Sequence, residues 1–142
     1  MGITPGAYLQ KRRRAAGMSL EDVAIMLDTS PAISNRARVD MLEEIEADLT
    51  PIDPGTVKAL RFAFPFDPTV LNRLIDLHVH RANLPAPQLC RECGCSFFDP
   101  CVDHDRRACA WADRDLCTHC VPPAPAADAI AANDDRRSEA VA

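Results

Sequence analysis

All seven cysteines of the chain lie between Cys90 and Cys120, in the segment CRECGCSFFDPCVDHDRRACAWADRDLCTHC. Two Cys-x-x-Cys pairs bound this segment, Cys90/Cys93 at its start and Cys117/Cys120 at its end. A Cys-x-x-Cys turn delivers two thiolates to one ion, and zinc binds four ligands at the corners of a tetrahedron. The spacing therefore predicts a structural metal site, with zinc as the preferred ion.

Clustered cysteines also occur as disulfide staples and as iron–sulfur ligands. Disulfides are the weaker interpretation, because the cysteine count is odd and the opening MGITPGAYLQKRRR lacks the apolar run of a secretory signal. The cytoplasm keeps thiols reduced, so we expect a cytoplasmic protein with metal-bound cysteines. An iron–sulfur cluster, with a redox-sensing role, is a less favoured alternative, because paired Cys-x-x-Cys turns suit tetrahedral zinc best.

Seven thiolates do not divide evenly into tetrahedral sites. The two outer pairs make one complete site, whose ligands are Cys90, Cys93, Cys117 and Cys120. This leaves an incomplete triplet of Cys95, Cys101 and Cys109. The sequence is therefore compatible with one ion, or with two ions if the triplet gains a further ligand.

The missing ligand has several candidates. His104, Asp99 and Asp103 lie within the triplet's own stretch of chain. Alternatively, the two ions share one thiolate, most naturally at Cys93-Gly94-Cys95, where a glycine permits a tight turn. His119 lies inside the last Cys-x-x-Cys pair, and we expect it to be a bystander. Trp111 is expected to pack on the metal-bound cysteines.

Length and charge limit the other possibilities. With 142 residues the chain has room for a small helical domain beside the Cys-rich segment, but not for a large enzyme core. The net charge of −5 argues against non-specific coating of nucleic acid. No apolar run approaches the ~18 residues of a membrane span. Because no nucleophile with a base, phosphate loop or pair of catalytic carboxylates is visible, we expect no enzymatic activity, no small-molecule substrate and no membrane partner.

Residues 1–80 predict an all-α domain of about five helices. Helix-start signals, each a capping residue followed by proline, recur at Thr4-Pro5, Ser30-Pro31, Asp53-Pro54 and Asp67-Pro68. A capping-box pattern over Ser19–Asp22 marks one further helix. Residues 81–89, RANLPAPQL, are expected to form a linker, and residues 121–142 a disordered tail rich in Ala, Pro and Asp.

The stretch AYLQKRRRAAGMSLEDVAIML resembles the first two helices of the lambda-repressor-like (Xre-type) helix-turn-helix family. The resemblance continues through MLEEIEADLTPIDPGTVKALRFAF and PFDPTVLNRLI, and covers about residues 4–78. It implies a helix-turn-helix bundle that binds double-stranded DNA through its second and third helices.

The chain departs from that family where DNA would be read. Between Asp28 and Glu46 it is about eight residues longer than the family pattern, and the segment TSPAISNRARVDM falls at the start of the expected recognition helix, whereas such helices are usually joined by a short turn. Side chains able to grip phosphate or read base edges are present on and near this segment. The candidate DNA-binding residues are Arg13, from the basic run Lys11–Arg14 on the outer face of the first helix, and Ser34, Asn35, Arg36 and Arg38.

Four acidic residues follow this segment and oppose DNA binding, since carboxylates repel phosphates. They are Glu43, Glu44, Glu46 and Asp48. The acidic run favours a second hypothesis, a protein-binding adaptor that keeps the helix-turn-helix fold but contacts RNA polymerase or another regulator.

The Cys-rich segment has a resemblance of its own. Its pattern C-x2-C-G-C-x5-C, followed by C-x-W and a terminal D-L-C-x2-C, is similar to a short module in proteins encoded by bacteriophages, prophages and related bacterial elements. All seven cysteines and Trp111 match it over about residues 90–120. The resemblance implies a zinc-binding accessory domain. The leading hypothesis is therefore a small bacterial or phage transcriptional regulator whose zinc module mediates self-association or partner binding.

Overall fold

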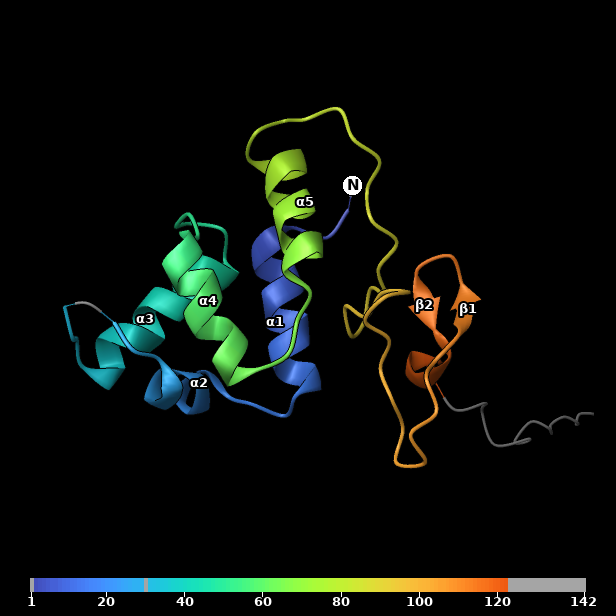
Figure 1. The fold of residues 1–142 in the computed structure, drawn as a ribbon, viewed down its shortest axis with the longest axis horizontal. Helices are drawn as coiled ribbons and strands as arrows, with labels where there is room; N and C mark the ends of the chain where they lie inside the picture. Colours follow the sequence, from blue (N-terminus) through green and yellow to red (C-terminus); the bar gives the residue numbers. More distant parts are fainter. Residues whose placement is uncertain (1, 30, 123–142) are drawn as a thin grey trace, which may run out of the picture.

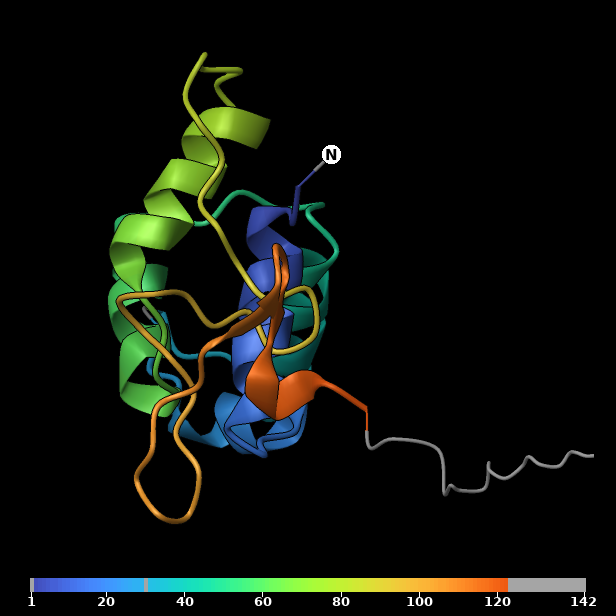
Figure 2. The ribbon, with the colours of Figure 1, turned by 90° about the vertical axis from the view of Figure 1, so that its right-hand side faces the viewer.

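The computed structural model describes residues 2–29 and 31–122 of the chain, and most of the predicted tail, residues 123–142, lies outside that part. Within it the chain forms five α-helices, then a two-stranded sheet and a short 3-10 helix. The helices pack in one group. Residues 90–120, called the Cys-rich unit below, lie beside α1 on the side away from α3 and α4 (Figure 1). A view turned by 90° places this unit in front of α1 (Figure 2).

Four of the five predicted helix starts are confirmed. The helices are α1 (Pro5–Ala15), α2 (Leu20–Met26), α3 (Asn35–Glu46), α4 (Pro54–Ala63) and α5 (Pro68–His78). The side chains that accept a first-turn backbone hydrogen bond include those of Thr4, Ser19, Asp53 and Asp67. Such caps satisfy N–H groups that have no partner inside the helix. At Ser19 the bond is reciprocal, because Asp22 accepts from the Ser19 backbone in turn.

The predicted start of the third helix at Ser30-Pro31 was wrong. The chain around Pro31 is not helical, and α3 begins at Asn35, with Ser34 as its N-cap. The Ser34 hydroxyl accepts a hydrogen bond from the Ala37 N–H at 3.1 Å. A proline opens a helix only where a capping residue precedes it and a full helical turn follows it, and here the residue that caps the helix, Ser34, lies further along the chain.

All five helices contribute apolar side chains to one core. Its buried helical members are Tyr8, Leu9, Val23, Ala24, Val39, Leu42, Ile45, Leu60, Ala63, Val70, Leu71 and Leu74. Leu89, from the end of the predicted linker, joins this core with 6% of its surface exposed. Tyr8 also accepts a hydrogen bond from the Asp67 N–H at 2.9 Å, and burial raises the pKa of Tyr8 to about 12. The core therefore reaches from α1 through to the segment that leads into the Cys-rich unit.

Arg13 connects α1 to the end of α3 through a hydrogen-bonded ion pair. Its Nε and Nη2 donate to the two carboxylate oxygens of Glu46 at 2.7 and 2.9 Å, and its Nη1 donates to the Met18 carbonyl at 2.8 Å. The hydrogen bond to Glu46 raises the pKa of Arg13, against the opposing effect of burial. The interpretation that Lys11–Arg14 lie on the outer face is wrong for Arg12 and Arg13, which are only 6% and 7% exposed.

The first turn of α1 lies directly against the end of α3. Gly6 donates its N–H to the Asp48 carboxylate at 2.8 Å, and Asp48 has a left-handed backbone with φ of 60°. A Cβ atom at Gly6 would overlap the carbonyl oxygen of Ile45 and lie 2.6 Å from that of Glu46. This approach is possible only because residue 6 has no side chain.

We expect Gly6→Ala to lower the free energy of unfolding by about 1–3 kcal/mol, because the added methyl group forces two packed backbones apart. Gly2→Ala is the control, since nothing lies within 4 Å of its added Cβ, and it should change stability by less than about 0.5 kcal/mol. Urea unfolding followed by circular dichroism measures both. Equal midpoints for the two variants would contradict the close approach.

The Cys-rich unit contains the only strands in the described part of the chain. β1 (Trp111–Asp113) pairs antiparallel with β2 (Leu116–Cys117), with Trp111 opposite Cys117, and the 3-10 helix η1 (Thr118–Cys120) follows. These strands are too short for an alternating pattern to reveal them in the sequence. No described helix is both long and apolar enough to cross a membrane.

Candidate metal centre

Sulfur atoms, rather than hydrocarbon side chains, form the centre of the Cys-rich unit. Cys90, Cys95 and Cys117 are completely buried, and the other four cysteines pack around them together with Trp111 and Leu116. The prediction that Trp111 packs on the cysteines is therefore confirmed. The remaining large apolar side chains of the unit are mostly exposed: Phe97, Phe98 and Val102. All seven cysteines carry free thiols, so the structure contains no disulfide staple among them.

Two groups of four sulfur atoms are compact enough to hold a metal ion, with all ligand atoms of each group within 4.8 Å of one another. The first group contains Cys90, Cys93, Cys95 and Cys117. The second contains Cys95, Cys101, Cys109 and Cys117. Cys95 and Cys117 therefore belong to both groups. Sharing of one thiolate at Cys93-Gly94-Cys95 by two ions stays a prediction. Cys120 lies in neither group.

The spacing of the sulfur atoms suits tetrahedral coordination. The Sγ–Sγ distances are 3.9 Å for Cys93–Cys117, 3.7 Å for Cys95–Cys109 and 3.6 Å for Cys101–Cys117. A metal–sulfur bond of about 2.3 Å gives a tetrahedron with edges of about 3.8 Å. The cysteines are thus already at ligand spacing, and an ion would need little rearrangement of their backbone.

Backbone hydrogen bonds hold this arrangement. Within the first turn, Gly94 donates to the Cys90 carbonyl at 2.9 Å and Cys90 donates to that of Cys95 at 3.0 Å. Cys109 donates to the Cys101 carbonyl at 3.0 Å, which brings two cysteines of the triplet together. The Cys117 N–H points at the Cys90 sulfur, 3.5 Å away. The two ends of the unit therefore meet through the sulfur cluster itself.

The thiols differ in how readily they ionise. Burial raises the pKa of Cys93, Cys95, Cys101 and Cys120. At Cys117 burial also favours the neutral thiol, but hydrogen bonds from the Cys120, Cys101 and Cys95 side chains outweigh it and lower the pKa to about 6. The pKa of Cys90 is likewise lowered, because backbone N–H groups of Cys117, Cys93 and Glu92 donate to it against the effect of burial. The two cysteines with lowered pKa values, Cys90 and Cys117, come from opposite ends of the unit and belong to the same group of four sulfur atoms.

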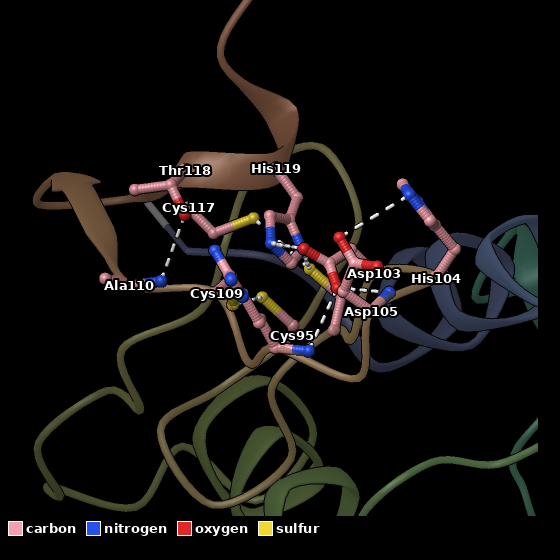
Figure 3. A network of polar contacts seen from close by, with 11 residues as sticks. Cys95, Asp103, His104, Asp105, Cys109, Ala110, Cys117, Thr118 and His119 are labelled. Carbon is pink, nitrogen blue, oxygen red and sulfur yellow. Dashed lines mark hydrogen bonds and ion pairs between the residues drawn. The ribbon is translucent and has the colours of Figure 1, made fainter.

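Two of the predicted fourth ligands of the triplet, His104 and Asp99, do not face the cysteines in the structure. The His104 side chain is 91% exposed and faces Asp105. Asp99 lies 3.6 Å from the Arg12 guanidinium instead of facing a cysteine. His119, expected to be a bystander, lies with its Nδ1 3.2 Å from the Cys101 sulfur (Figure 3). The sequence offered no signal for this contact, because His119 and Cys101 lie far apart along the chain.

Arg12 joins the Cys-rich unit to the helices. Its Nη1 donates to the Cys93 carbonyl at 3.3 Å, and its Nη2 lies 3.6 Å from the Asp99 carboxylate. Gly94, with φ of 75°, lies against α1, where an added Cβ would be 3.2 Å from Arg12 Cδ and 3.3 Å from Lys11 Cβ. A buried cation beside clustered thiolates offsets part of their negative charge. The side chain predicted to be on an outer face is therefore the contact between the two units.

The candidate DNA-binding residues divide into two kinds. Asn35 and Arg36 lie at the exposed amino-terminal end of α3, where the Arg36 side chain is 81% exposed and 3.4 Å from Asp40. Ser34 caps α3. Arg38 turns towards α2, where its Nη1 lies 3.4 Å from the Ala24 carbonyl. Arg13 is held by Glu46, so its guanidinium is not available to a phosphate.

No protein-family model, curated protein or solved structure matches the chain. The site must therefore be interpreted from its own geometry.

Removal of metal by a strong chelator should unfold the Cys-rich unit while leaving the helices intact. The unit has too little buried hydrocarbon to fold alone, and metal binding supplies about 10 kcal/mol or more in small zinc modules. Trp111 is the only tryptophan and packs on the cysteines, so its fluorescence reports the unit, and far-ultraviolet circular dichroism reports the helices. Added zinc should restore the fluorescence. An unchanged Trp111 signal with no metal released would contradict a metal-dependent unit.

Proposed function

We propose that this chain is a small DNA-binding transcriptional regulator of the lambda-repressor-like helix-turn-helix type. In this proposal α2 and α3 form the DNA-reading pair, and the Cys-rich unit is a structural zinc module. The observation that carries it is the amino-terminal end of α3, which is exposed and presents Asn35 and Arg36 side by side. In helix-turn-helix proteins the residues at this end of the recognition helix contact base edges in the major groove.

The chemistry of these two residues supports this role. An asparagine amide pairs with the edge of adenine, and an arginine guanidinium pairs with that of guanine. Arg36 is held only by an exposed ion pair with Asp40, an interaction worth little in water and easily exchanged for a base or phosphate. Arg36 is therefore available to a ligand, unlike Arg13 and Arg38. Asn35 is exposed, but its Oδ1 accepts a 3.3 Å hydrogen bond from Arg38 Nη1, which a base edge would have to replace.

Three of the acidic residues that argued against DNA binding have partners within the fold, and one of them is paired with a cation. Glu46 is paired with Arg13, and Asp48 accepts a hydrogen bond from the Gly6 N–H in the first turn of α1. Glu44 accepts a hydrogen bond from the Thr50 hydroxyl at 3.0 Å. All three belong to the carboxyl-terminal end of α3 and the turn that follows, at the opposite end of the helix from Asn35. The repulsion between these carboxylates and phosphates is correspondingly smaller than the sequence suggests.

Zinc is the proposed occupant of the cysteine cluster. Free thiols gathered at tetrahedral spacing from two Cys-x-x-Cys turns are the usual ligands of structural zinc sites. Such sites have no open coordination position, which fits a structural rather than a catalytic role. Because the unit packs on α1 through Arg12, the ion would stabilise the helices from the side away from α3.

Arg36→Ala should weaken binding to a specific DNA site by about 1–3 kcal/mol, a roughly 5- to 150-fold rise in Kd. Fluorescence anisotropy with fragments from the region upstream of the chain's own coding sequence, titrated across salt, measures this. Arg107→Ala is the control, because it removes an exposed arginine from the Cys-rich unit, and it should leave sequence preference unchanged. If the wild-type protein binds none of these fragments at low salt, DNA binding is ruled out for this target set.

A second candidate function, a protein-binding adaptor, is favoured by exposed apolar side chains on α2. Ile25 is 68% exposed and Met26 is 49% exposed. Ile25 lies in a shallow groove between α2 and α3 that also includes Glu21, Asn35, Arg36 and Val39. An apolar side chain beside polar ones is typical of a small protein-contact surface.

The two candidates predict opposite responses to substitution in this groove. For an adaptor, Ile25→Ser should weaken binding to purified RNA polymerase at least tenfold, since the apolar contact is lost, whereas Arg36→Ala should have little effect. Leu49→Ser is the control, because Leu49 is 77% exposed outside the groove. Biolayer interferometry with each variant measures the effect. Binding of the polymerase that Ile25→Ser leaves unchanged would contradict the adaptor at this surface.

A further inference from the structure

We propose that the cysteine cluster holds two metal ions, and that His119 is the terminal ligand of the second ion, oriented by Asp103. This inference deepens the proposed zinc module and rests on it. The second ion would be bound by Cys95, Cys101, Cys109 and His119. Cys117 would then serve the first ion, together with Cys90, Cys93 and Cys120.

The ligand count supports two ions. Two separate tetrahedral sites need eight ligand atoms, and the unit has seven cysteine sulfurs. His119 supplies an eighth, so no thiolate has to be shared. Cys120 then also has a role, which neither compact group of four sulfur atoms provides. It packs against the cluster from η1, the same turn that carries His119.

The geometry of His119 is that of a ligand. Its Nδ1 lies 3.2 Å from the Cys101 sulfur. Bonds of about 2.3 Å to sulfur and about 2.0 Å to nitrogen place two ligands of one tetrahedral ion about 3.5 Å apart. The distance from His119 Nδ1 to the Cys101 sulfur is therefore within a few tenths of an ångström of that separation. Its side chain is 27% exposed, whereas that of His104 is 91% exposed.

Asp103 supplies the outer contact that a metal-bound histidine requires. A ligating imidazole usually directs its second ring nitrogen at a carboxylate or carbonyl, which fixes the orientation of the ring. The Asp103 Oδ2 faces the His119 Nε2 at 3.9 Å (Figure 3), whereas the other ring nitrogen, Nδ1, faces the Cys101 sulfur. Its Oδ1 accepts the backbone N–H groups of Asp105 and Arg107, both at 2.9 Å. This carboxylate is therefore anchored by the backbone with one oxygen left for His119.

Charge favours a neutral eighth ligand. Seven thiolates and two divalent ions leave a net charge of −3, whereas an eighth thiolate would leave −4. The burial of Arg12 beside Cys93 offsets part of this charge on one side of the cluster only. A histidine completes the second site without adding to it, and Asp103 lies near the surface, where water screens its carboxylate.

Native mass spectrometry and a chelator-competition titration of the full chain with zinc test this assignment. Wild-type protein and the control His104→Ala should each bind two ions. His119→Ala should bind one ion with wild-type affinity and lose the second or bind it at least tenfold more weakly. Asp103→Asn should keep both ions but weaken the second about 10- to 100-fold. His119→Cys, which keeps a ligand at this position, should bind two ions.

Cobalt substitution distinguishes the ligand sets independently of affinity. The visible spectrum of the wild-type cobalt form should combine a four-sulfur site with a three-sulfur, one-nitrogen site, and His119→Cys should convert the second into the first type. Two ions bound equally well by His119→Ala would overturn the assignment in favour of shared thiolates. A single ion in the wild type would overturn it while leaving the proposed zinc module intact. No bound metal in any variant would overturn both.

Discussion

The crowding of seven sulfur atoms into one small volume is the constraint on which the carboxyl-terminal part of the structure depends. The apolar side chains that might have formed a core there are mostly on the surface, so hydrocarbon burial cannot hold this unit together. Thiolates at tetrahedral spacing repel one another unless a cation lies among them. The crowding that disfavours the unit without a cation also places its thiols at the spacing of metal ligands.

A buried arginine, Arg12, connects the Cys-rich unit to the helices. Arg12 leaves α1, passes beside Gly94 and reaches the Cys93 carbonyl and the Asp99 carboxylate, so one side chain contacts both units. Its Nε has no hydrogen-bond partner within the described residues. Burial of this guanidinium therefore costs free energy unless the neighbouring Asp99 carboxylate stays charged. The Cys-rich unit is thus held on α1 by polar contacts to the Cys93 backbone and to Asp99.

The helical part distributes its charges in a way that matters for recognition. Arg13, Glu46 and Asp48 are used to fix α1 against the end of α3, where each has a specific partner. Arg36 and Asn35 at the other end of α3 are exposed, and the apolar Ile25 lies next to them. One end of α3 is therefore fixed by contacts within the fold, and the other end is exposed.

The sequence alone determined the helical class, four of the five helix starts and the presence in the Cys-rich segment of cysteines that could hold a metal ion. These features depend on local chemistry: a capping side chain and proline act within one turn, and a Cys-x-x-Cys pair places two sulfurs together wherever it occurs. The tertiary structure decided what depends on distant contacts. It placed Arg12 and Arg13 inside, because their partners Cys93 and Glu46 come from other parts of the chain. It brought His119 to Cys101 and left His104 in solvent, since the fold of the unit, not sequence proximity, sets which side chains meet.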